Sequence, residues 1–166
     1  MTPTILFLLC MLIGGATGLR SMTGIAMVTL AAQPHWPHLK WLHLSGTGLS
    51  FLAHPVTMII FVLLAVGELV ADKLPFIPSR IQPGPLAARF AFGALCASAL
   101  AVAAGVSGIL PVLLPALIGG IAAIVAAYAG YWLRRSITAR RVKDLPVALL
   151  EDAAAILLAL FAVSRF

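Results

Sequence analysis

The sequence predicts an all-α protein, a polytopic bundle of membrane helices, and three observations support this fold class. Of its 166 residues, 62% are hydrophobic and only 10% are charged, whereas a typical soluble domain has about 25% charged residues. The apolar residues gather in stretches of the length that crosses a bilayer, about 20 residues. Most of the basic residues gather in two short segments between these stretches, as in the cytoplasmic loops of membrane proteins. We therefore expect a single transmembrane domain over residues 1–166.

Five apolar stretches predict about five spans. The first, residues 4–32, is interrupted by Gly14, Gly15, Gly18 and Arg20. It is too long for one simple span and too short for two, because each span needs about 20 residues. We predict a broken or re-entrant helix here, with the glycines as the break that frees backbone groups to line a cavity. The other stretches run from about 51 to 71, 86 to 106, 112 to 133 and 145 to 163.

The basic side chains predict the orientation of the chain. Both the 73–89 and the 134–144 loops are expected to be cytoplasmic, and the 33–50 and 107–111 loops to lie on the other side. If the first stretch crosses, the N-terminus is cytoplasmic and the chain has five crossings; if it re-enters, the N-terminus moves outside. The basic loops are also expected to attract anionic lipid headgroups. The headgroup candidates are Arg80, Arg89, Arg134, Arg135, Arg140, Arg141 and Lys143.

Small residues recur every four positions in three of the stretches. They are Gly14 and Gly18; Gly93, Ala97, Ala101 and Gly105; and Gly119, Ala123 and Ala127. Lipid tails give helices no hydrophobic reason to associate, so close backbone approach and dispersion must hold them together. We expect these rows to pack within one chain, in preference to forming an oligomer interface.

The two halves of the chain share a faint repeat. The tetrapeptide LIGG at 12–15 recurs at 117–120, and RSMT at 20–23 is echoed by RSIT at 135–138. In the five-crossing topology the two helix pairs face opposite ways, which predicts an inverted repeat of the kind found in transporters and channels. Chance similarity in a chain built from Leu, Ala, Gly and Val is the alternative.

Five ionisable residues stand within or beside the apolar stretches. Glu68 and Asp72 are four residues apart and share one helix face. Glu151 and Asp152 are flanked by apolar residues, and one such charge at mid-bilayer costs about 2.5–3.5 kcal/mol. Arg20 is the natural counter-ion, because a guanidinium can bind a carboxylate through two hydrogen bonds.

We expect these five residues to form a lipid-shielded cluster that binds a substrate or ion. Supporting roles are expected for Gly14, Gly15, Gly18 and Lys73. Two simpler interpretations stay open. Asp72 and Lys73 would mark the wet end of a helix, and Arg20 would extend outward to the interface.

The sequence offers little sign of an enzyme. The motifs HExxH and GxSxG are absent, as is a phosphate-binding glycine loop with lysine. We predict no catalytic residue, no cofactor and no metal site, and we expect Cys10 and Cys96 to be packing residues. The net charge of +6 lies mostly in the two basic loops, so nucleic acid is not an expected partner.

The expected function is a small transporter or channel for an ion or small charged solute. The alternatives are a non-transporting membrane protein that binds lipid headgroups or a partner, and a lipid-phosphate translocase. Because five helices make a thin wall for a pore, we expect a homo-oligomer, with a dimer favoured. Membrane lipids are the other expected partners.

Three segments match the motifs of a known family: GLRSMTG at 18–24, GELVADKLPFIPSR at 67–80 and LPVALLEDAAAI at 145–156. Over nearly the whole chain the sequence resembles the bacterial membrane-protein family known only as domain of unknown function 4126. This resemblance implies a small multi-pass protein of the bacterial inner membrane and carries no activity. The matching residues are Gly18, Arg20, Glu68, Asp72, Lys73, Pro75, Pro78, Glu151 and Asp152.

Overall fold

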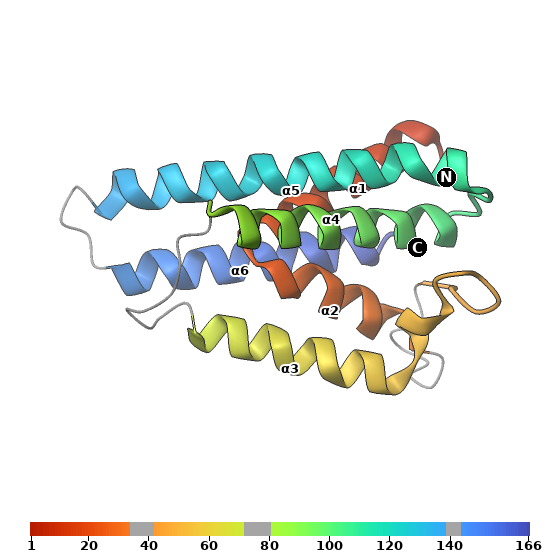
Figure 1. The fold of residues 1–166 in the computed structure, drawn as a ribbon, viewed down its shortest axis with the longest axis horizontal. Coiled ribbons are helices and arrows are strands. Elements are labelled where there is room, and N and C mark those ends of the chain that lie inside the picture. The colour runs from red at the N-terminus through yellow and green to blue at the C-terminus, as the bar shows by residue number, and fades with distance from the viewer. Residues whose placement is uncertain (34–41, 72–80, 139–143) are drawn as a thin grey trace.

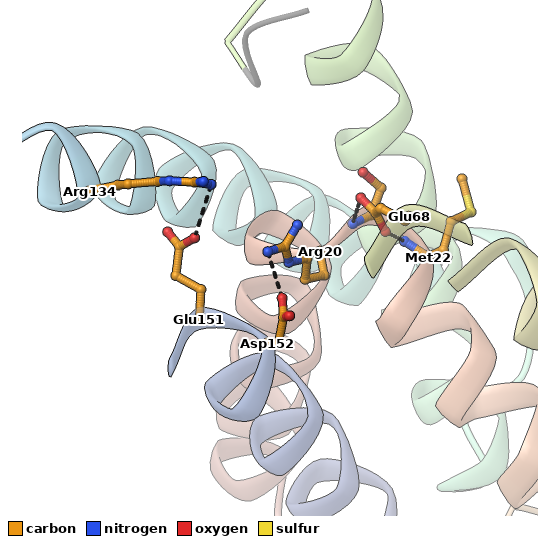
Figure 2. A network of polar contacts seen from close by, with 7 residues as sticks. Arg20, Met22, Glu68, Arg134, Glu151 and Asp152 are labelled. Carbon is orange, nitrogen blue, oxygen red and sulfur yellow. Dashed lines mark hydrogen bonds and ion pairs between the residues drawn. The ribbon is translucent and has the colours of Figure 1, made fainter. Parts of the chain in front are cut away.

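The computed structural model describes residues 1–33, 42–71, 81–138 and 144–166, and all regular structure in this part is helical. The predicted all-α class is therefore confirmed. The helices are α1 (Pro3–Leu19), α2 (Ser21–Ala31), a short 3₁₀ helix (Ser50–Ala53), α3 (Pro55–Ala71), α4 (Pro83–Ala103), α5 (Ile109–Thr138) and α6 (Asp144–Val163). Figure 1 shows α1, α4, α5 and α6 along the long axis of the molecule, with α2 and α3 beside them.

The long helices of the bundle suit a bilayer. In the described residues, three helices are long and apolar enough to cross a membrane, namely α4, α5 up to Ile137 and α6 from Pro146. The apolar helices α1, α2 and α3 are shorter, with 17, 11 and 17 residues. The start of α4 is earlier than predicted because Pro83 occupies its first turn, where a proline costs no hydrogen bond. A membrane helical bundle is thus confirmed.

The direction of α1 follows from its contacts with α5. A Cβ built on Gly14 would lie 2.9 Å from the Cα of Gly119, and Gly18 meets Ala123 in the same way. Because both residue numbers rise together, α1 and α5 run in the same direction. An inverted repeat would require the helices that carry the two LIGG sequences to run in opposite directions, so the geometry of α1 and α5 does not fit that prediction.

Helices α1 and α2 form a hairpin. A Cβ on Gly24 of α2 would lie 3.3 Å from the Cβ of Thr17 and 3.5 Å from the carbonyl oxygen of Ile13, so α2 folds back along α1. Figure 1 shows α2 returning toward the end at which α1 begins, and both chain termini lie toward that end. The first stretch is therefore broken, and it forms a hairpin whose two ends lie at the same end of the bundle, which is the geometry that the re-entrant alternative predicts.

Small residues bring the helices of the bundle into close contact within one chain, as predicted. A Cβ on Gly119 would lie 2.5 Å from the carbonyl oxygen of Gly93, and Ala97, Ala101 and Ala123 are all 0% exposed. Such contact gives dispersion energy that larger side chains would prevent. The small residues that begin at Gly93 on α4 and at Gly119 on α5 therefore hold these two helices together.

Gly105 does not belong to the row that begins at Gly93, contrary to the prediction, because α4 ends two residues earlier at Ala103. Gly105 has φ 87°, and its N–H bonds the Val102 carbonyl at 3.0 Å while the Val106 N–H bonds the Ala101 carbonyl at 3.0 Å. This pair of bonds is the Schellman cap, whose left-handed position favours glycine. Gly105 thus terminates α4 and starts the turn to α5.

Candidate functional site

The hairpin turns at a single residue, Arg20. It has an extended conformation, with φ −138° and ψ 110°, and lies between the end of α1 and the start of α2. The predicted break is confirmed, but its position is not, because α1 runs without interruption through Gly14, Gly15 and Gly18. Two of those glycines instead allow α1 to approach α5, while a Cβ on Gly15 would meet nothing within 4 Å.

Glu68 of α3 caps the start of α2. The Ser21 N–H donates to Glu68 Oε1 at 2.9 Å, and the Met22 N–H donates to Oε2 at 2.8 Å. The first N–H groups of a helix have no partner inside it and carry partial positive charge. Since the preceding residue, Arg20, makes no side-chain capping bond, the carboxylate of another helix takes that role.

Arg89 of α4 satisfies the other side of the break. Its Nη1 donates to the carbonyl oxygen of Gly18 at 2.9 Å, near the end of α1, and its Nε donates to Ser21 Oγ at 3.3 Å. A cation at a helix C-terminus is favourable because the last carbonyls carry partial negative charge. Opposite charges on α3 and α4 thus match the two helix ends that meet at Arg20.

This position of Arg89 corrects the prediction that it lies in a loop and contacts lipid headgroups. Arg89 lies within α4 and is only 5% exposed, because the helix starts at Pro83, about two turns earlier. The early prolines were the available signal, since a proline in the first turn would have placed Arg89 inside the helix. The capping amides of Ser21 and Met22 had no signal in the sequence, because any residue offers an N–H.

Arg20 itself pairs with α6. Its side chain is 1% exposed, and Nη2 lies 2.5 Å from Oδ1 of Asp152. The neighbouring Glu151 points to α5, where its Oε2 lies 3.7 Å from Nη1 of Arg134. The predicted meeting of Arg20 with an acid of the last stretch is therefore present, and its simpler alternative, an arginine extended outward to the interface, does not occur.

We call the following residues the Arg20 cluster: Arg20, Glu68, Arg89, Arg134, Glu151 and Asp152. They come from five segments, namely the α1–α2 turn, α3, α4, α5 and α6. The predicted members Asp72 and Lys73 lie outside the described residues, as do the headgroup candidates Arg80, Arg140, Arg141 and Lys143. Of the remaining headgroup candidates, Arg134 joins the cluster, and Arg135 lies 5.5 Å from the centre of the exposed Trp132 ring.

The Arg20 cluster lies inside the apolar length of the bundle. Gly18 packs against Ala126 of α5, and at 1.5 Å per residue Ala126 is about 25 Å from Ile109 and about 9 Å from Trp132. An exposed Trp next to arginines is typical of the membrane–water interface. Arg20 is therefore deeper than that interface, whereas Arg134 reaches the cluster from just beyond Trp132. The cluster lies nearer the end of the bundle at which α5 ends and α6 begins, which we call the basic end.

Comparison with known proteins adds one finding to this geometry. A family model described as Domain of unknown function (DUF4126) matches residues 7–165. The chain belongs to the DUF4126 family. No curated protein and no solved structure was found to match the chain.

Within this DUF4126 chain, the three family-like segments meet at one place. Arg20 belongs to the first, Glu68 to the second, and Glu151 with Asp152 to the third, and all four residues are members of the Arg20 cluster. Three arginines and three carboxylates balance in charge among the described members. Such an arrangement can hold a proton or exchange one charged partner for another without leaving a bare charge in lipid.

Proposed function

We propose that this protein is a small integral membrane transporter or channel that moves an ion or small charged solute past the Arg20 cluster. The observation that carries the proposal is the hairpin of α1 and α2, which ends inside the bundle at a buried arginine paired with Asp152. Interrupted helices that meet charged residues within the membrane are typical of transporter sites. Charged side chains at such depth are costly and mark ion or proton pathways by default.

The pairing within the cluster suggests which members would act. Glu68 and Arg89 are engaged with backbone groups at the helix break, so we assign them a positioning role. The Arg20–Asp152 pair joins two side chains, and an anion that arrives at Arg20 would compete with Asp152 for the guanidinium. Binding and release of charge is the proposed role of the pair, and we propose no catalysis.

The setting of this function is also proposed. We propose a location in the bacterial inner membrane with the basic end cytoplasmic, because the segment between α3 and α4 and the segment from Arg134 to Asp144 hold most of the basic side chains. We further propose a homodimer surrounded by lipid. Its support is α3, on which Ala65 is the only buried residue and large apolar side chains such as Leu63 and Val70 are exposed. The proposal does not depend on an inverted repeat.

The test is flux into liposomes that contain the purified protein. Separate vesicle samples each contain an indicator for one ion, a pH-sensitive dye for protons and radiolabelled sodium, rubidium in place of potassium, chloride or phosphate for the others, and each is exposed to a gradient of that ion. We expect at least one gradient to discharge faster than in protein-free vesicles. The double variant Arg20→Met/Asp152→Leu removes the pair without leaving a charge, so its flux should fall to the protein-free rate.

Gly15→Ala is the matched control, because its new methyl meets nothing within 4 Å, and its flux should equal that of the wild type. If the flux of the double variant equalled that of the wild type, the Arg20–Asp152 pair would not be the transport site. If no gradient discharged faster than in protein-free vesicles, the transport proposal itself would be wrong.

A further inference from the structure

A groove lies at the end of the bundle opposite the basic end. Its walls come from the segment Gly46–Leu49, the last turns of α4 and the first turns of α5, and its volume is about 750 Å³. It includes Ser107 and Gly108 of the α4–α5 turn. The groove is remote from Arg20, because α1 begins at this end of the molecule and carries Arg20 away from it.

The side chains that line the groove favour a hydrocarbon occupant. Among the described residues, none that lines the groove is charged. The hydroxyl of Thr47 already donates to the Leu44 carbonyl at 2.7 Å and accepts the Leu49 N–H at 3.2 Å, and the hydroxyl of Ser98 donates to the Ala94 carbonyl at 2.8 Å. With these polar groups engaged, the groove offers a ligand mainly apolar contact.

The length of the groove matches one leaflet of a bilayer. It extends from the helix ends inward to Leu95 on α4, which is about 12 Å from Ala103 at 1.5 Å per residue. One leaflet of a hydrocarbon core has a depth of about 15 Å. The rim also carries Ile109, which is 88% exposed, so the groove is open beside the α4–α5 turn.

We propose that this groove binds one acyl chain of a bilayer lipid from the leaflet at this end. The chain enters between α4 and α5 with its headgroup above Gly46–Gly48 and the α4–α5 turn. Because the lining side chains that the structure describes are uncharged, the groove selects for the hydrocarbon chain and not for an anionic headgroup. Binding is therefore insensitive to salt, in contrast to lipid attraction by basic loops.

Photo-crosslinking tests the proposal. The full chain is reconstituted in phosphatidylcholine vesicles that contain phosphatidylcholine with a diazirine at the middle of one acyl chain, and adducts are mapped by mass spectrometry. We expect more adducts on Leu95–Val102 and Val112–Ala116 than at Ile121 and Val125, which are 55% and 62% exposed on α5. The excess should be the same at low and high salt.

Two variants fill the groove from opposite walls. Ala116→Phe adds a ring from α5, and Gly48→Phe adds one where a Cβ meets nothing within 4 Å, so the second should fold even if the first does not. Both should remove the excess adducts, whereas Leu117→Phe, which is next to Ala116 but does not line the groove, should retain them. The proposal is overturned if groove adducts do not exceed those at Ile121 and Val125, if a folded filling variant retains the excess, or if a second copy shields the groove from the probe.

Discussion

Replacing Asp152 with leucine is expected to lower the free energy of unfolding by about 3–5 kcal/mol, because it removes a carboxylate that pairs with the buried guanidinium of Arg20. Arg20 is 1% exposed and its Nη2 lies 2.5 Å from Oδ1 of Asp152. Arg20→Met should be similarly costly, since it removes a cation that pairs with the buried carboxylate of Asp152. SDS unfolding in mixed micelles, followed by tryptophan fluorescence, measures both changes.

The double variant distinguishes a charge effect from a packing effect. Arg20→Met/Asp152→Leu removes both charges, and apolar replacement of a buried ion pair is often neutral or stabilising. We expect the double variant to be more stable than either single variant, with a coupling energy of about 3 kcal/mol. Leu150→Ala on the same helix is the control, because Leu150 is 71% exposed and its truncation should change little. If the double variant lost as much free energy of unfolding as the two single variants together, Arg20 and Asp152 would not stabilise the fold through their mutual interaction.

Gly14→Ala is expected to destabilise the bundle by about 3 kcal/mol, at the upper end of the usual cost of overpacking. Its methyl group would lie 2.9 Å from the Cα and the carbonyl carbon of Gly119. Both obstacles are backbone atoms, so no side chain can rotate away and α1 must separate from α5. That separation would also shift the hairpin tip that carries Arg20.

The next residue provides the control for Gly14→Ala. Gly15→Ala adds the same methyl group on the same helix, but nothing lies within 4 Å of it. Because alanine is favoured over glycine in a helix by roughly 0.5–1 kcal/mol, this variant should be unchanged or slightly more stable in the same unfolding measurement. Equal losses in both variants would mean that helix propensity or lipid contact, and not the approach of α1 to α5, governs this position.

Much of the fold could be predicted from the sequence, because the length of an apolar stretch and the cost of a charge in lipid are local properties. The lengths of the apolar stretches predict the helices and the interruption of the first stretch. The cost of a charge in lipid predicts Arg20, Glu68, Glu151 and Asp152 as site residues. The partner of Arg20 could also be anticipated, since a buried guanidinium requires a carboxylate.

The remaining features depend on how separate helices meet. The return of α2 depends on its packing along α1, where Gly24 meets Thr17 and Ile13, while Gly14 and Gly18 pack α1 on α5. No local pattern contains these contacts. For the same reason the glycines were wrongly expected to break the helix. Arg89 is predicted in a loop because the apolar stretch begins at about residue 86, whereas α4 already begins at Pro83. An apolar pattern alone places the ends of a helix poorly.

The return of α2 alongside α1 is the basis of the whole account, and site-specific cysteine labelling tests it most directly. Single cysteines replace the exposed residues Thr2, Ser45 and Ser136, and a membrane-impermeant maleimide is applied to intact spheroplasts and to inverted membrane vesicles. The wild type is the background control, since Cys10 and Cys96 are both 0% exposed. The account predicts that Thr2→Cys and Ser45→Cys react from one side of the membrane and Ser136→Cys from the other. Reaction of Thr2→Cys and Ser45→Cys from opposite sides would show that the first stretch crosses the membrane, and it would contradict the placement of Arg20 at the tip of a hairpin.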